Sequence, residues 1–203
     1  MANSQLSISN LALRHFSQNP VINLTDNNPS VNAINAYWEA ARDDVLSEHP
    51  WSFATVTKAL SYSFNGAEYC DDWTFGYDYI TQSIASLWYV YDFYTADKKD
   101  EQDFEVRYDP TLDMRVILTN LSNAVAEYSY VQDDVTLWSH KFVMAFSYRL
   151  AAMMCPIITG DAEKALTLMQ LSNVYIGEEK RIDSTRKKKR PEVTSKYVNA
   201  RGG

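Results

Sequence analysis

Side chains that could perform nucleophilic or acid–base chemistry are few and widely separated in this 203-residue sequence. A serine or cysteine nucleophile needs a histidine beside it, and usually a carboxylate that orients the histidine. The three histidines, His15, His49 and His140, lie in predicted helices or next to a proline, and none accompanies a glycine-framed serine or cysteine. We interpret all three as packing or capping residues and expect no catalytic residues, so the protein is not expected to be an enzyme.

The residues that could hold a metal ion or a cofactor also form no known pattern. Cys70 and Cys155 are too few for a zinc cluster and are expected to be reduced thiols. Residues 97–103 are acidic like a calcium loop but lack its central glycine and its final glutamate. The neighbouring acids Asp133 and Asp134 are better interpreted as residues at a helix start. Since a glycine-rich phosphate loop is missing too, we expect no metal and no cofactor.

The charge is distributed unevenly along the chain. Residues 183–203 contain seven basic and two acidic residues, a net charge of +5, whereas residues 1–182 contain 12 basic and 24 acidic residues, a net of −12. We predict that residues 183–203 form an extended basic C-terminal arm without regular structure. Its core is the run Arg186, Lys187, Lys188, Lys189 and Arg190. This run suits a solvated tail, an arm that contacts phosphates, or an arm that docks on an acidic protein, and the sequence leaves these open.

The composition is that of a globular chain. Hydrophobic residues make up 46% and charged residues 22%, which excludes a wholly disordered chain, a collagen and a coiled-coil rod. Aromatic residues, at 13%, are typical of a β-rich part or of large interfaces. The N-terminus has no signal-peptide pattern, and no stretch reaches 18 uninterrupted apolar residues, so we expect no membrane-spanning segment.

The first 50 residues predict two helices. The first covers residues 7–18 and ends before Pro20. The second begins at Asn28 and Pro29, an N-cap followed by a proline in the first helical position. Its apolar stripe predicts one buried face and consists of Val31, Ile34, Trp38, Ala41 and Val45. This helix is expected to end near Pro50.

The remaining chain predicts strands followed by two more helices. Short aromatic and β-branched stretches between residues 51 and 132 are typical of antiparallel strands, although residues 77–86 suit a strand or a short helix equally well. Residues 134–156 are apolar on most faces and predict a buried helix that Pro156 ends. A fourth helix is expected over residues 162–182, with Glu178 and Glu179 in solvent.

These elements predict a mainly α fold with a β insertion, of the α+β class. Residues 1–50 and 133–182 are expected to form a four-helix bundle. The antiparallel strands of residues 51–132 would be inserted between its second and third helices. Residues 183–203 would leave the bundle as the basic arm.

Five short segments, in this order, resemble the head-to-tail adaptor proteins of tailed bacteriophages, the tail tubular protein A group. They are PVINLTD at 20–26, ARDDVL at 41–46, PWSFA at 50–54, YRLAA at 148–152 and ITGD at 158–161. The likeness covers about half of the chain, and the five consecutive cations of the arm are not part of the family pattern. The resemblance marks five residues as family-signature core residues: Trp38, Pro50, Trp51, Phe53 and Arg149.

The resemblance implies a structural protein of the virion, located at the head–tail interface and assembled in the host cytoplasm. Such adaptors form a ring, here expected to be a dodecamer, beneath the portal protein. The ring extends the DNA channel, lets genomic DNA pass without sequence-specific binding, and presents a platform to downstream tail proteins. It also implies a portal-docking arm, whose expected contact residues are Arg186, Lys187, Lys188, Lys189, Arg190, Lys196 and Tyr197.

Three other functions remain open at this point. The main alternative is a nucleic-acid-binding protein that contacts phosphates through its basic tail. A small enzyme of unknown class is disfavoured because the sequence lacks a catalytic constellation. Another ring protein of the same virion, such as a tail terminator, would differ mainly in its neighbours.

Overall fold

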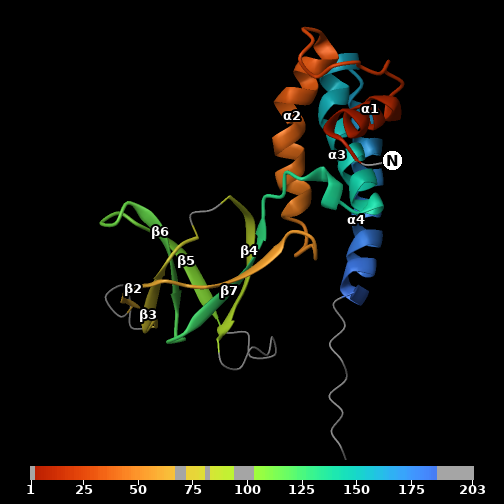
Figure 1. Cartoon of the computed structure of the whole chain (residues 1–203). Helices are drawn as coiled ribbons and strands as arrows, with labels where there is room; N and C mark the ends of the chain where they lie inside the picture. The colour runs from red at the N-terminus through yellow and green to blue at the C-terminus, as the bar shows by residue number, and fades with distance from the viewer. Residues whose placement is uncertain (1–2, 67–71, 81–82, 94–102, 187–203) are drawn as a thin grey trace, which may run out of the picture.

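The computed structural model describes residues 3–66, 72–80, 83–93 and 103–186. Helices occupy one side of the molecule and strands the other, as Figure 1 shows. The described residues form four α-helices and two antiparallel sheets with seven strands, at 46% helix and 25% strand. The four helices are α1 (Gln5–His15), α2 (Pro29–Leu46), α3 (His140–Thr159) and α4 (Ala162–Arg186).

Polar side chains at the N-caps define where three of these helices begin. The Ser4 hydroxyl accepts a hydrogen bond from the backbone of Ser7 and starts α1 in a capping box. The Asn28 side chain accepts from the Val31 backbone, with Pro29 in the first turn of α2, which confirms the predicted start of this helix. Ser139 caps α3 in the same way. Local sequence therefore fixes the helix starts.

Helix α3 is the central element of the helical part. Helices α1, α2 and α4 each pack mainly against it. Its sequence is apolar on most faces, so each neighbour can bury a stripe against a different side. Among the described helices, only α3 is long and apolar enough to cross a membrane by length and composition, with a mean hydropathy of 1.5, and most of it is buried within the protein. These properties suit the core helix of this arrangement.

The expected end of the third helix at Pro156 is wrong. A proline removes one backbone donor, yet α3 continues through Pro156 to Thr159. The Thr159 hydroxyl donates to the Cys155 carbonyl at 2.7 Å, which adds a hydrogen bond to this last turn. Thr159 is the last residue of α3, and the C-cap, Gly160, has the left-handed conformation (φ 74°) that glycine adopts without strain.

The strands form two sheets. The first has the order β1-β7-β4, from β1 (Thr55–Ala59), β7 (Ala124–Tyr130) and β4 (Ile84–Asp92). The second has the order β2-β3-β6-β5, from β2 (Tyr62–Asn65), β3 (Phe75–Asp78), β6 (Met114–Thr119) and β5 (Phe104–Asp109). The chain passes from one sheet to the other between β1 and β2, where the Leu60 backbone donates to the Ala124 carbonyl at 2.9 Å.

Strand β3 is an element that the sequence did not predict. It contains Gly76, and the ring of Phe64 in β2 lies directly over it. A Cβ atom at position 76 would lie 2.3 Å from this ring, so any other residue there would require the Phe64 ring to move. Within the ambiguous segment 77–86, Tyr77 and Asp78 end β3, and Ile84 begins β4.

The predicted fold class, a mainly α four-helix bundle with inserted strands, is wrong. The buried residues of the four helices form one cluster, but α1, α2 and α4 each pack mainly on α3 and little on one another, so α3 is a central helix and the arrangement is not the predicted bundle. The strands are not an insertion in a bundle but two sheets with hydrophobic clusters of their own. The physical reason is that α3 can bury all three partners, while the aromatic strands bury their side chains between two sheets.

Candidate functional site

Four of the five family-signature residues lie near one another, where α2 turns into β1 beside the start of α3. Trp51 and Phe53 pack edge-on against Phe142, with ring centroids 5.3 and 4.8 Å away. Trp38 packs edge-on against Phe146 at 4.7 Å. Together with Trp138, which stacks on Trp38, and with the half-buried Pro50 beside Trp51, they form what we name the aromatic cluster. The cluster fixes α2 and the α2–β1 corner to α3.

Trp51 is the central anchor of this cluster. Its side chain is fully buried, and its indole N–H donates to the Val45 carbonyl at 2.9 Å in the last turn of α2. The Thr55 hydroxyl donates to the Trp51 carbonyl at 2.6 Å, which ties the first residue of β1 to the same point. Pro50 and Trp51 therefore act as structural residues of the corner.

Arg149, the fifth signature residue, lies in a buried polar network between three helices. Its guanidinium donates to Ser172 at 3.2 Å and to Asn173 at 2.9 Å, both on α4, and forms an ion pair with Asp44 on α2. The Ser172 hydroxyl in turn donates to the Ala145 carbonyl at 2.9 Å. A buried guanidinium with several acceptors holds the elements that carry them together.

Arg42, from the ARDDVL segment, performs the same role at the other side of α2. It pairs with Asp43 at 2.8 Å and with Asp133, which lies after β7. Asp134 caps the 3-10 turn η3 (Val135–Leu137), accepting from the Thr136 backbone at 2.9 Å. The hydrogen bonds from Thr136 lower the pKa of Asp134. The two acids therefore have structural roles, but the predicted start of the third helix at residue 134 is wrong, because Asp134 caps only a short 3-10 turn and α3 begins at His140 behind its own cap, Ser139.

A second buried polar cluster holds the end of α4 on the α2–β1 corner. Asp183, which is 1% exposed, accepts hydrogen bonds from the Ser52 backbone at 3.2 Å and lies 3.1 Å from Nε2 of His49. Glu179, one turn earlier on α4 and also buried, accepts from the Ser139 hydroxyl at 2.6 Å. We name His49, Ser52, Ser139, Glu179 and Asp183 the α4 anchor.

The α4 anchor corrects two sequence predictions. The basic arm was expected to begin at residue 183, but α4 continues to Arg186 and Asp183 is part of the core. Glu179 was expected in solvent. The sequence did contain a pattern that indicates the burial of Glu179 and Asp183. Together with Ser172 and Ile176 they are spaced by four, three and four residues, which places all four on one face of a helix. It was missed because acidic residues are seldom fully buried.

The docking arm itself lies almost wholly outside the described residues. Arg186 is the last residue of α4. The other expected arm residues, Lys187, Lys188, Lys189, Arg190, Lys196 and Tyr197, are not described, and neither are Cys70 and residues 97–102. The portal-docking role of the arm therefore stays a prediction.

The described titratable residues form no catalytic arrangement. His15 shares a hydrogen bond of 2.9 Å with Ser147, but Ser147 is fully buried and its hydroxyl also bonds to the Met144 carbonyl. The His15 ring stacks on Tyr148 at 3.7 Å, and burial lowers its pKa to about 4. Within the described ranges, His, Cys, Asp and Glu form no group of three that could hold a metal ion, and Cys155 is a buried free thiol.

Large hydrophobic side chains are exposed at several places on the described part of the chain, and two of these surfaces matter for the argument below. One is the β5–β6 hairpin, where Tyr108 is 60% exposed and Leu112 is 44% exposed. We name residues 108–114, at the end of this hairpin, the hairpin tip. The other is the outer face of α4, where Leu166 and Val174 are more than half exposed. Exposed apolar groups gathered on a projecting element are typical of contacts between proteins.

Comparisons of the sequence with protein-family models and with curated proteins find no match. The class of the protein therefore depends on the surfaces and networks described above and on the order of its sequence motifs. The exposed hydrophobic surfaces were not predicted, because exposure depends on neighbours that the sequence pattern does not identify.

Proposed function

We propose that this protein is a structural component of a bacteriophage virion, a head-to-tail adaptor that forms a ring beneath the portal. The proposal starts from five segments that resemble the tail tubular protein A group in the same order along the chain. A ring of this kind would extend the DNA channel and offer a platform to downstream tail proteins. We keep the dodecamer as the proposed ring size.

The observation that carries the proposal is the use that the chain makes of its signature residues. Trp38, Trp51 and Phe53 join α2 to α3, and Arg149 joins α2, α3 and α4. The contacts of these residues connect separate elements of the fold. Such use supports a structural protein over an enzyme, because an enzyme concentrates its distinctive residues where substrate binds.

The exposed surfaces support repeated contacts between copies. A closed ring needs two different complementary surfaces on each subunit. The hairpin tip and the helical part lie at opposite ends of the molecule, as Figure 1 shows, so each subunit can offer one surface to each neighbour. The acidic charge of residues 1–182 would repel DNA from a channel wall and let it slide.

The α4 anchor supports the role of the arm. Asp183 is buried against the α2–β1 corner, so residues 187–203 start from a fixed point on the molecule. An arm that starts from a rigid point loses less entropy when it docks than one attached through a long linker. We propose that this basic arm docks on an acidic surface of the portal.

Deletion of residues 187–203 tests the docking arm without removing Asp183. We expect the truncated protein to unfold at the temperature of the full chain but to lose attachment to portal-bearing heads, measured by co-sedimentation. Arg181→Gln, which removes an exposed cation from α4 outside the arm, is the matched control and should attach normally. Truncated protein that still completes infectious particles would contradict the docking role.

Two further results decide the class of the protein. Mass spectrometry of purified virus particles should detect this chain, and its absence from them would refute the adaptor proposal. The nucleic-acid alternative predicts that the full chain binds free DNA and that affinity falls by orders of magnitude between about 50 and 200 mM salt. We expect little binding to free DNA at either salt concentration.

A further inference from the structure

A groove runs along α1 beside the start of α3, with a volume of about 770 Å³. Its lining includes the apolar side chains of Leu6, Leu11 and Val143 together with polar side chains of α1. Arg14 and His140, both exposed, belong to the same lining. The groove is thus large enough for several side chains of a partner and combines apolar area with hydrogen-bonding groups.

The charge of the groove is the opposite of the charge of the surrounding chain. Its lining, drawn from the described residues, contains the exposed cation Arg14 and includes no acidic side chain. Residues of the first turn of α1 and the first residue of α3 also line it, and helix N-termini carry partial positive charge. Residues 1–182 have a net charge of −12. The groove therefore favours an apolar segment that carries a carboxylate and disfavours the basic arm.

The hairpin tip has the matching chemistry. Tyr108 and Leu112 expose apolar area, and Asp113 supplies an exposed carboxylate. The tip is also rigid, because the buried Asp109 carboxylate accepts from the backbones of Thr111 at 2.7 Å and Leu112 at 3.2 Å. The Tyr108 hydroxyl donates to Asp113 and joins the two sides of the turn. A rigid tip loses little conformational entropy on docking.

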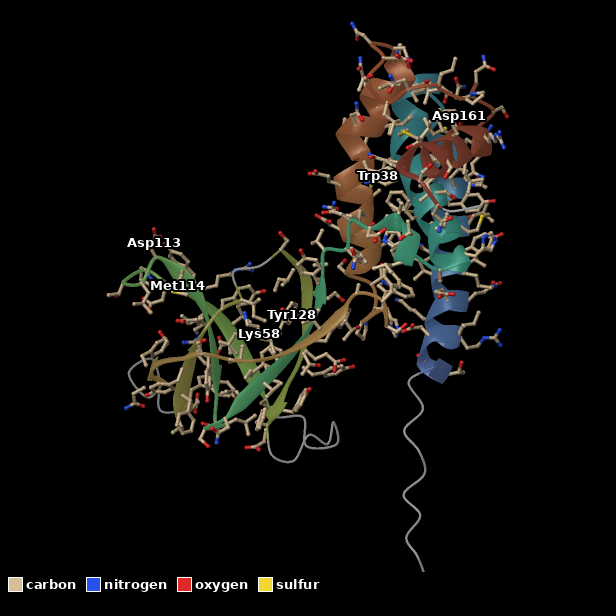
Figure 2. All side chains as sticks on the ribbon, viewed as in Figure 1. Trp38, Lys58, Asp113, Met114, Tyr128 and Asp161 are labelled. Atoms are coloured by element: carbon tan, nitrogen blue, oxygen red, sulfur yellow. The ribbon has the colours of Figure 1, made fainter. Side chains whose placement is uncertain are left out.

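The two features cannot meet within one chain. Figure 2 shows Asp113 at the end of the sheets that lies farthest from the helices, whereas the groove is formed by α1 and α3. We propose that the hairpin tip of one subunit docks in the α1–α3 groove of a second copy. This contact joins two different surfaces, so it repeats from copy to copy and can close a ring. The inference rests on the proposed ring and identifies the contact that builds it.

Charge reversal tests this contact directly in the full chain. We expect Arg14→Glu or Asp113→Arg alone to weaken self-association at least tenfold, measured by sedimentation over a range of protein concentrations. The double variant restores an opposite pair at every contact, so it should recover most of the association. Asp26→Arg, which reverses an exposed acid in the connection between α1 and α2, is the matched control and should associate like the wild type.

A second variant guards against a folding defect at the turn. Leu112→Ser leaves the Asp109 and Tyr108 side-chain hydrogen bonds in place, so it should keep the wild-type unfolding temperature while weakening association about tenfold. If the subunits assemble only on the portal, the same variants are compared by ring formation on portal-bearing heads.

The possible outcomes separate this inference from the proposed function. Rings that form equally well with Arg14→Glu, Asp113→Arg and Leu112→Ser would overturn the contact but leave the adaptor proposal intact. Loss of association only on deletion of residues 187–203 would show that the arm joins the copies and would also overturn the contact. A chain that stays monomeric both alone and on portal-bearing heads would contradict the contact and the ring together.

Discussion

The helical part and the β part of this molecule bury their side chains in different ways. Among the described residues, the helices share one cluster of 24 buried residues that includes Trp51, Phe142 and Phe146. The described part of the sheets holds two smaller clusters, of four and three buried residues. Large aromatic side chains in the β part also remain outside, among them Tyr62 and Phe93 at more than half exposure.

This difference indicates that the two parts of the molecule have different roles, one in stability and the other in contacts with other molecules. The helical part buries aromatic rings together with charged residues such as Arg149, Glu179 and Asp183, which join distant elements. The β part leaves apolar area exposed, so less of its side-chain surface contributes to its own folding. We infer that the helical part supplies most of the stability of the subunit and that the β part supplies contact surface. Three substitutions test this comparison, given from the largest expected effect to the smallest.

Trp51→Ala should have the largest effect. It removes a fully buried ring and its hydrogen bond to Val45, and we expect the free energy of unfolding to fall by roughly 3–5 kcal/mol. Urea unfolding followed by circular dichroism measures it. Tyr62→Ala, in the β part, is the control and should cost well under half of that, since Tyr62 is 58% exposed. Equal losses in the two variants would contradict the comparison.

Asp183→Asn should have an intermediate effect. It removes the charge that faces His49 and weakens two acceptors of the Ser52 backbone, and we expect a loss of about 2–3 kcal/mol, because the group is buried but His49 is partly exposed. The melting temperature measures it, with Glu163→Gln on the exposed side of α4 as control. A melting temperature equal to that of the control would show that the α4 anchor does not stabilise the fold.

His15 should give the smallest effect, through pH. Burial lowers its pKa to about 4 in the folded protein, from an ordinary value of 6.5. The unfolded chain therefore takes up the proton first, so this contribution to stability is complete above about pH 6.5 and is lost as the pH falls towards 4. We expect about 1 kcal/mol between pH 7 and pH 5, a discounted value because the ring is half-buried.

The measurement compares urea midpoints at these two pH values in the wild type and in His15→Gln. The wild type should lose more stability than the variant, since all other titrating groups are shared. The same pH dependence in both proteins would show that His15 does not hold a lowered pKa.

Local sequence predicted the helices better than it predicted their surroundings. The stripe through Ile34, Trp38 and Val45 is buried, and Asn28 caps α2 as expected. These features depend on periodicity and on hydrogen bonds within one turn, which the sequence shows directly. The end at Pro156 was wrong because a local rule about proline was weaker than the packing of α3 against three helices.

The hairpin tip and the α1–α3 groove, unlike the helix caps, could not be predicted from local sequence. Tyr108 is exposed, whereas Tyr77 and Tyr128 are buried. All three lie in short aromatic strands, and the local sequence around them does not show which ring will be covered. The groove exists only because α1 lies beside the start of α3, more than one hundred residues later in the chain. Neither surface could be predicted from a single sequence, because each requires the placement of segments that are distant along the chain.

By itself, the sequence determined the starts of α2 and α4, the unequal charge of body and arm, and the order of the motifs that resemble a phage adaptor. The tertiary structure alone decided that Glu179 and Asp183 are buried, that α3 is the central helix, and that the hairpin tip and the α1–α3 groove lie at opposite ends. Caps and periodicity arise within a few residues of one another. Burial and exposure arise from whatever distant segments pack on a residue, and for that reason only the folded chain reveals them.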